Sequence, residues 1–270
     1  MRLKTARAAH LLASVAVMGL LALSAAGCTT TNDDITGSIG TPQAPRTDAD
    51  WRRSLEVWGA RYRANPGDVE AAISYARALR ATDQHAQAVA VLEQASMRNP
   101  HNMPLLGAYG RALADAGQFP QALDALSRAH TPDNPDWRIL NAQGAVLDQM
   151  GRHAEAQRHY DAALKIVPNE PSVMSNLGLS YALMKDLKRA ESTLRQAVAQ
   201  PNAGQKVRQN LALVVGLQGR FAEAEKIASA DLPEADAAAN VAYLRQMLSQ
   251  QDAWKKLGKK PSVPRPGAGT

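Results

Sequence analysis

The side chains best able to act as nucleophiles, bases or soft metal ligands are one cysteine, Cys28, and six histidines among 270 residues. A single thiol permits no internal disulfide, and no second cysteine stands at metal-ligand spacing from it. The sequence contains no G-x-S-x-G, G-x-x-x-x-G-K-[ST], G-x-G-x-x-G or H-E-x-x-H motif, and its acidic residues form no obvious pair. These patterns predict a protein that is not an enzyme and that uses no cofactor and no metal.

The residues before Cys28 have the order of a secretory signal. Residues 1–10 are basic, residues 11–26 are apolar, and small side chains directly precede the cysteine. The apolar stretch has 16 residues, fewer than the roughly 20 that span a bilayer, which argues against a permanent transmembrane helix. In one interpretation, ordinary cleavage after Ala26 leaves Cys28 as an exposed thiol on a soluble periplasmic protein.

Residues 1–27 also resemble the signal peptide of a bacterial lipoprotein, in which small residues precede an obligatory cysteine, although Ala25 stands where leucine is usual. The resemblance implies cleavage before Cys28 and lipid on its sulfur and its new amino group. Thr29 is not the aspartate that favours the inner membrane in diderm bacteria, so the resemblance implies an outer-membrane anchor facing the periplasm. Residues 28–50 are then the lipidated cysteine and a flexible tether, because Thr, Gly, Pro and Asp dominate them.

The charge is unevenly distributed along the chain. The formal net charge is +6, of which the first 27 residues contribute +3 and the last 20 contribute +4. The body between them is therefore almost neutral, which argues against nucleic acid as a partner because a nucleic-acid-binding domain would present a basic face. The tail, residues 251–270, is basic and rich in proline and glycine, so we expect it to be disordered.

The body of the chain repeats with a period of 34 residues. Five successive units begin at residues 69, 103, 137, 171 and 205, with no insertion between them. Small residues recur at positions 8, 20 and 27 of each unit, and the exception is Asp231 at position 27 of the fifth. Larger residues occupy positions 4, 7, 11 and 24, which in the second unit are Leu106, Tyr109, Leu113 and Leu126.

This pattern resembles the tetratricopeptide repeat, a helix-turn-helix unit of 34 residues. The resemblance predicts an all-α fold, in which a right-handed solenoid of about five helix pairs with capping helices occupies residues 51–250. Within a pair, such as residues 71–82 and 85–97, the small residues let the two helices approach closely. His85 and His153 stand at position 17, beside the turn between the helices, and we expect both to be solvated.

Breakers and terminal segments complete the predicted solenoid. Gly117, Gly151 and Gly219 fall at the turn between the helices of a pair, where a left-handed conformation ends the first helix. Residues 51–64 are predicted to form a lone second helix that caps the N-terminal end, and residues 234–251 a final helix that covers the last unit.

Repeat solenoids bind partners in a groove lined by the first helix of each pair, mainly at positions 2, 5, 9, 12 and 13. The predicted groove contains Arg77, Arg80, Arg111, Arg138, Asn141, Asn176, Lys206 and Gln209. Glu70, Asp115 and Asp148 lie among them, so the groove is basic on balance. Arginine binds carboxylates through two donors, which favours an acidic or C-terminal peptide as the guest; the alternative is that these are ordinary solubilising charges.

The lipoprotein-like signal, the short tether and about five repeats together resemble the tight-adherence (Tad/Flp) pilus assembly lipoproteins known as TadD. The resemblance implies a non-enzymatic scaffold that helps to assemble the outer-membrane secretin and other pilus components. The alternatives are a type IV pilus pilotin, or a repeat scaffold in envelope polysaccharide export or peptidoglycan assembly. Only Asn176 and Lys206 match the Lys/Asn clamp of chaperone-binding repeats, so a cytosolic chaperone adaptor is not expected.

Overall fold

The computed structural model describes residues 47–257, with side chains for residues 47–250. The predicted signal peptide, Cys28 and most of the tether lie outside the described residues, as does the tail from residue 258 onward. The described part is helical apart from its turns, which include an isolated bridge between Thr131 and Asn134. It divides into two compact units after Pro168. None of the described helices is both long and apolar enough to cross a bilayer.

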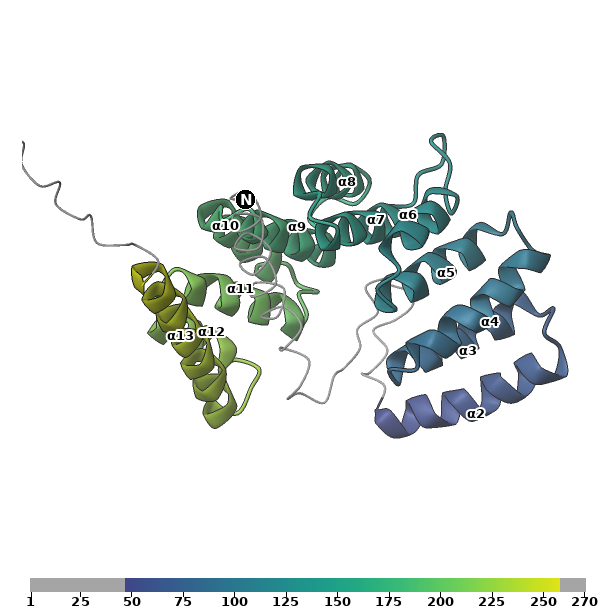
Figure 1. Ribbon diagram of the computed structural model, residues 1–270, viewed down its shortest axis with the longest axis horizontal. Helices are drawn as coiled ribbons and strands as arrows, with labels where there is room; N and C mark the ends of the chain where they lie inside the picture. Colours follow the sequence, from purple (N-terminus) through teal and green to yellow (C-terminus); the bar gives the residue numbers. More distant parts are fainter. Residues whose placement is uncertain (1–46, 258–270) are drawn as a thin grey trace, which may run out of the picture. The chain divides into compact units, whose positions relative to one another are not determined.

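In the first unit, each described helix packs against the next one along the chain, as Figure 1 shows. The helices are α2 (Asp48–Ala64), α3 (Val69–Ala81), α4 (His85–Arg98), α5 (Met103–Asp115), α6 (Phe119–Ser127), α7 (Trp137–Gln149) and α8 (His153–Ile166). The first helices of the pairs, α3, α5 and α7, also contact their neighbours of the same kind. This alternation is the helix-pair packing that the 34-residue period predicts.

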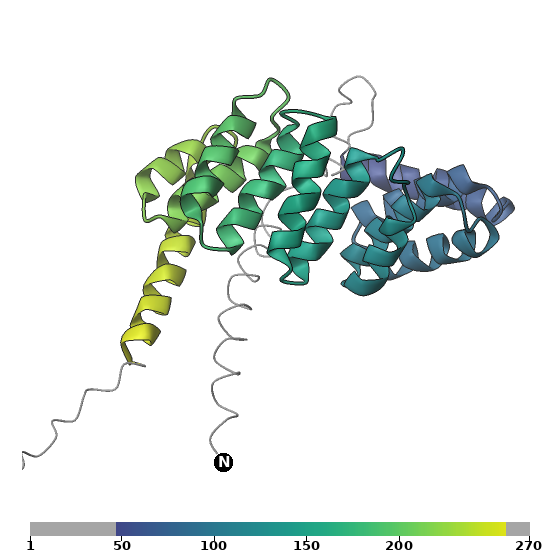
Figure 2. The ribbon, with the colours of Figure 1, turned by 90° about the horizontal axis from the view of Figure 1, so that it is seen from above.

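The second unit continues the same pattern. Its helices are α9 (Pro171–Leu183), α10 (Leu187–Val198), α11 (Gln205–Leu217), α12 (Phe221–Ala228) and α13 (Glu234–Leu257). The first helices α9 and α11 contact each other, and α13 packs on both α11 and α12 as the predicted final helix. The C-terminal half of α13 extends beyond the other helices of this unit (Figure 2).

Two helix ends differ from the predicted boundaries. The capping helix α2 begins at Asp48 rather than at residue 51, because Thr47 and Asp50 form a reciprocal capping box at its N-terminus. The final helix continues to Leu257, into the segment that the sequence assigned to a disordered tail. Residues 251–257 contain no proline or glycine, and the first helix breaker is Gly258.

In each of the five helix pairs, the turn contains a residue with positive φ at position 15 of the unit. Gly117, Gly151 and Gly219 have φ values of 73°, 74° and 82°, which confirms the predicted left-handed turns. Asp83 and Lys185 hold the same position in the first and fourth units, with φ values of 59° and 66°. Because the left-handed region costs a residue with a side chain roughly 1–2 kcal/mol, packing of the pair outweighs local preference there.

The two helices of a pair meet where position 8 faces position 24. A Cβ atom added to Gly144 would lie 2.4 Å from Cε1 of Tyr160, and one added to Gly110 would lie 2.6 Å from Cγ of Leu126. The alanines at position 20 are fully buried in all five units. The small and large residues of the repeat therefore interlock as predicted.

The fifth unit departs from the repeat at Asp231, and the structure gives the physical reason. Helix α12 ends early, at Ala228, so Asp231 lies in the turn that follows it. Its carboxylate accepts two hydrogen bonds from the guanidinium of Arg208 at position 4, with distances of 2.5 Å and 2.6 Å. A bidentate ion pair thus holds Asp231 at the position where the other four units carry a buried alanine.

Candidate protein-binding site

Three of the predicted groove arginines converge in the first unit. Arg77 and Arg80 on α3 and Arg111 on α5 line one small depression, which we call the arginine depression. Its complete lining is Ile73, Ala76, Arg77, Arg80, Leu92, Ala108 and Arg111. Arg77 and Arg111 both stand at position 9, one repeat apart, on neighbouring helices. The repeat therefore places two arginines on neighbouring helices, where they line one depression together with aliphatic side chains.

Ion pairs hold the acidic residues of this region in fixed places. Nε of Arg80 donates to the Asp115 carboxylate at 2.5 Å, which links α3 to α5. Arg61 on α2 donates to Asp68 at 2.8 Å and to Glu70 at 2.9 Å. The pKa of Asp68 is lowered mainly by a hydrogen bond from the backbone N–H of Ala71 and also by the hydrogen bond and charge of Arg61. Glu70, a predicted groove acid, is thus compensated from α2.

Helix α7 carries two further residues of the predicted groove. Arg138 is half-buried, and Cζ of its guanidinium lies 4.5 Å from the ring centroid of Trp137. Asn141 is buried, so it does not line an accessible surface as the sequence predicted. Both Asn141 and Ser175 stand at position 5, and Ser175 is buried where its hydroxyl accepts from Asn210 of the next first helix. At these two repeats, position 5 is therefore buried and does not line a groove.

The remaining predicted groove residues belong to the second unit. Asn176 is half-buried on α9, while Lys206 is exposed and Gln209 is half-buried on α11. The same two helices carry leucines at positions 9 and 13, all of them half-buried: Leu179, Leu183, Leu213 and Leu217. The face of the second unit is therefore apolar where the first unit is rich in arginine.

Asp148, a predicted groove acid, is instead the centre of a buried polar cluster. Its carboxylate accepts from the Tyr160 hydroxyl at 2.9 Å and lies 2.8 Å from Nδ1 of His153. Burial, the larger cause, and the negative charge of Asp148 raise the pKa of Tyr160 well above its usual value. His153 is not the solvated turn residue that the sequence predicted, because its ring binds this carboxylate and is 22% exposed.

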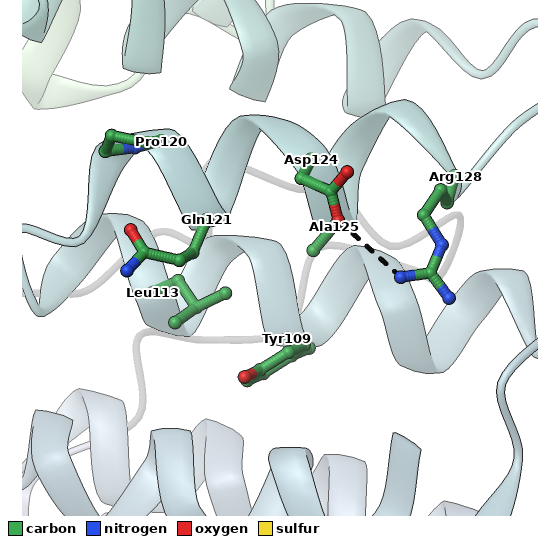
Figure 3. Close-up of a pocket in the computed structure, with 7 residues that line it drawn as sticks. All are labelled: Tyr109, Leu113, Pro120, Gln121, Asp124, Ala125 and Arg128. Atoms are coloured by element: carbon green, nitrogen blue, oxygen red, sulfur yellow. Dashed lines mark ion pairs between the residues drawn. The ribbon is translucent and has the colours of Figure 1, made fainter. Parts of the chain in front are cut away.

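A second cavity, missed in the sequence, lies along α5 and α6 and has a volume of about 420 Å³. Figure 3 shows its lining: Tyr109, Leu113, Pro120, Gln121, Asp124, Ala125 and Arg128. Asp124 and Arg128 form an ion pair at 3.6 Å, so their charges offset one another. Burial and the charge of Glu93 raise the pKa of Tyr109, which keeps its phenol neutral. The spacing of the repeat does not distinguish Tyr109, which is half-exposed, from the large residues of the repeat that are buried.

Among residues 47–250, no group of three or more His, Cys, Asp or Glu side chains is placed to hold a metal ion. Arginine guanidinium groups favour carboxylates, which they can bind through two donors, and Nε of Arg80 already binds the carboxylate of Asp115. The cavity along α5 and α6 has no such charge preference.

Comparison with known proteins identifies the fold. Two family models of the tetratricopeptide repeat match the chain, one over residues 79–144 and the other over residues 138–202. Residues 79–202 therefore consist of tetratricopeptide repeats, and the predicted all-α repeat fold is confirmed. Such repeats are protein-interaction scaffolds and imply protein partners. No curated protein has a sequence that matches this chain.

Solved structures agree on the fold. PilW, titled a widely conserved type IV pilus biogenesis factor, superposes with a TM-score of 0.62 at 15% identity, over 72% of this chain and 91% of its own. TTC0263, a thermophilic repeat protein of Thermus thermophilus, superposes with a TM-score of 0.58 at 21% identity, over 67% of this chain and 98% of its own. A chain of the Cut9–Hcn1 hetero-tetramer of the APC/C superposes with a TM-score of 0.61 at 14% identity, over 75% of this chain but 40% of its own. At these identities the likeness shows the fold alone.

Proposed function

We propose that this protein is a scaffold of the bacterial cell envelope that binds protein partners through the first helices of its repeats. We further propose that lipid on Cys28 anchors it to the outer membrane, facing the periplasm, and that it assists assembly of a Tad/Flp-type pilus. The arginine depression is the observation that carries the binding role. It gathers Arg77, Arg80 and Arg111 where the first helices of two repeats adjoin.

The arrangement of these arginines supports binding more than solubility. Charges that serve only solubility are expected to spread over the surface rather than to gather around aliphatic side chains. Here the three side chains share one depression with Ile73 and Ala108. A partner that covers it would remove water from the guanidinium groups, where charge complementarity gives specificity.

The pilus role rests on the resemblance of the whole chain to the TadD lipoproteins: a lipoprotein-like signal, a short polar tether and about five repeats. Its likeness to PilW, itself titled a pilus biogenesis factor, supplies the fold and is compatible with this role. A lipid anchor would hold the repeats beside the membrane, since two membrane signals suffice for stable attachment.

The anchor is tested by the intact mass of the protein extracted from membranes of a diderm bacterium, beside a Cys28→Ser variant. We expect a mass equal to residues 28–270 plus acyl chains in the wild type and its loss in the variant. A mass that begins at Gly27 without lipid would reject the anchor and leave a soluble periplasmic protein.

The role is tested by crosslinking in cells that assemble the pilus, followed by purification of the wild-type protein. Recovery of a secretin or another pilus component supports the proposal. Recovery of polysaccharide synthases, of polymer or of peptidoglycan enzymes instead would move the scaffold to export or to wall assembly. These alternatives remain scaffolds, so they would contradict the pilus role without contradicting the binding role.

A further inference from the structure

We infer that the last part of α13, residues 243–257, is an interfacial helix that lies on an anionic lipid surface. We call these residues the distal segment of α13. The inference goes beyond the proposed scaffold function, and it does not depend on lipid at Cys28. The contact combines an apolar stripe along the helix with a cluster of lysines at its end.

Helix α13 completes its packing on the second unit before the distal segment ends. Ala237, Val241 and Leu244 are buried, with exposures of 0%, 7% and 5%. They form one stripe of the helix, which packs on α11 and α12. The C-terminal half of α13 extends beyond the other helices of the unit (Figure 2). The distal segment is therefore longer than closure of the last repeat requires.

A second apolar stripe runs along another side of the helix. Tyr243 is 43% exposed and Met247 is half-buried. Trp254 and Leu257 follow Met247 by seven and ten residues in the same helix. At about 100° per residue, these four positions fall within a sector of about 80°, whose centre is about 120° from the centre of the buried stripe. The helix thus has an apolar side separate from the one that packs on its unit.

The chain is strongly basic over the same segment and just after it. Between residues 245 and 270, Asp252 is the single acid, and the cations are Arg245, Lys255, Lys256, Lys259, Lys260 and Arg265. Cζ of Arg245 lies 4.7 Å from the ring centroid of Phe221, so this cation is already held within the unit. The four lysines fall within six residues. We assign the contact with lipid phosphates to them, because such clusters beside an amphipathic helix bind anionic headgroups.

The residue types in the distal segment favour lipid as the occupant. Tyrosine and tryptophan have amphipathic rings that prefer the membrane–water interface. Lysine can bury its methylene chain along apolar surface while its ammonium group stays beside the headgroups. Fifteen helical residues extend about 22 Å, less than the roughly 30 Å of the hydrocarbon core, so the segment would lie along the surface. Its apolar stripe and lysines then supply the two kinds of attraction that hold an interfacial helix.

The experiment uses the full chain carrying Cys28→Ser, so that no acyl chain contributes. An environment-sensitive fluorophore is attached through Gln250→Cys, a position within the sector of the apolar stripe, or through Ser249→Cys, about 120° from it. Vesicles are made of phosphatidylglycerol with phosphatidylethanolamine, or of phosphatidylcholine alone. We expect anionic vesicles to shift the emission from position 250 to shorter wavelength, more than from position 249, and raised salt to weaken this binding. Because the readout is local, attachment through residues 1–27 would not produce it.

Three variants in the chain labelled at position 250 locate the contact. Lys255→Gln/Lys256→Gln should weaken binding to anionic vesicles by at least about tenfold. Met247→Ser/Trp254→Ser should weaken it by at least about tenfold as well, because it removes half of the apolar stripe. The matched control, Lys188→Gln/Lys226→Gln, removes two exposed lysines of α10 and α12 and should leave binding unchanged. Circular dichroism melting checks that all three are folded.

Several outcomes would overturn the inference. One is no shift at position 250 with anionic vesicles, and another is an equal shift with phosphatidylcholine. Equal weakening in the control variant would reduce the effect to attraction of the whole protein. A shift that appears without vesicles and grows with protein concentration would show that a second copy covers the stripe instead. None of these results involves a protein partner, so the proposed scaffold function stands or falls separately by crosslinking.

Discussion

The contact between Gly144 and Tyr160 offers the sharpest test of how the repeat packs. We predict that Gly144→Ala destabilises the protein, although alanine is the better helix former. Intrinsic propensity alone favours alanine over glycine in a helix interior by about 1 kcal/mol. The added Cβ, however, would stand 2.4 Å from Cε1, 2.7 Å from Cζ and 2.8 Å from Cδ1 of the tyrosine ring.

The ring has no room to give way. Tyr160 is 1% exposed, and its hydroxyl is held by the buried carboxylate of Asp148. Separation of α7 from α8 is then the only relief, and overpacking of this kind costs about 1–3 kcal/mol. Because the ring is pinned, we expect the upper part of this range, about 2–3 kcal/mol, which after the propensity gain of about 1 kcal/mol leaves a net loss of about 1–2 kcal/mol in the free energy of unfolding. The melting temperature should fall by about 2–8 °C.

The assay is urea unfolding followed by circular dichroism, with Gly144→Ala, Tyr160→Leu and the double variant measured together. The double variant recreates the alanine–leucine pair that Ala76 and Leu92 form at the same positions of the first unit. We expect it to be more stable than the sum of the single effects by at least about 1 kcal/mol, as for residues in contact. A Gly144→Ala protein as stable as the wild type, or more stable, would refute the packing register.

Four further predictions use the same unfolding assay. Ala156→Leu should overpack a fully buried position and cost about 1–3 kcal/mol; an unchanged melting temperature would show that the register is wrong. Lys185→Gly should stabilise the turn, because Lys185 has a φ of 66° and glycine adopts this conformation without strain. The expected gain in the free energy of unfolding is about 1 kcal/mol minus the backbone entropy that glycine loses on folding. A loss of stability would mean that the turn is not left-handed. Asp231→Ala should destabilise by about 1–3 kcal/mol because it strands the guanidinium of Arg208, and Arg208→Met added to it should restore stability; a double variant no better than the single would contradict this. Burial opposes ionisation of Glu191, but hydrogen bonds from Gln218, Arg220 and Arg195 outweigh it and lower its pKa to about 2. Its stabilisation is present above the unfolded value of 4.5 and is lost as pH falls toward 2, so the stability difference from Glu191→Gln should shrink over that window and be constant above it.

The repeat made most of the fold predictable. A gapless period fixes which residues face one another, so position 8 against position 24, and the left-handed turn at Gly117, follow from spacing alone. The sequence predicted the ends of the first and last described helices less well than the repeats between them. The helix α13 continues past its predicted end because no breaker occurs before Gly258, whereas composition indicated a disordered tail.

The candidate site was predictable in part, because a repeat position gives the direction of a side chain but not its depth. Arg77 and Arg111 were placed on one surface by their shared position, and the structure brings them together. Asn141 shares this predicted surface by its repeat position but is fully buried. Asp148 turns inward because Tyr160 replaces the usual leucine at position 24 and offers it a hydroxyl. Such pairings depend on two particular side chains meeting, which no periodic pattern encodes.

The most direct test of the central claim, that this protein binds a partner over the arginine depression, is site-specific photo-crosslinking in living cells. A photoreactive residue at Ala81, four residues after Arg77 and hence on the same face of α3, reports on that region. The same residue at Gln121, which lines the cavity along α5 and α6, is the matched control. We predict a crosslinked envelope protein from position 81 that disappears in the Arg77→Gln/Arg111→Gln background, and none from position 121. Crosslinks from position 121 alone, or crosslinks from position 81 that persist in that background, would contradict the account.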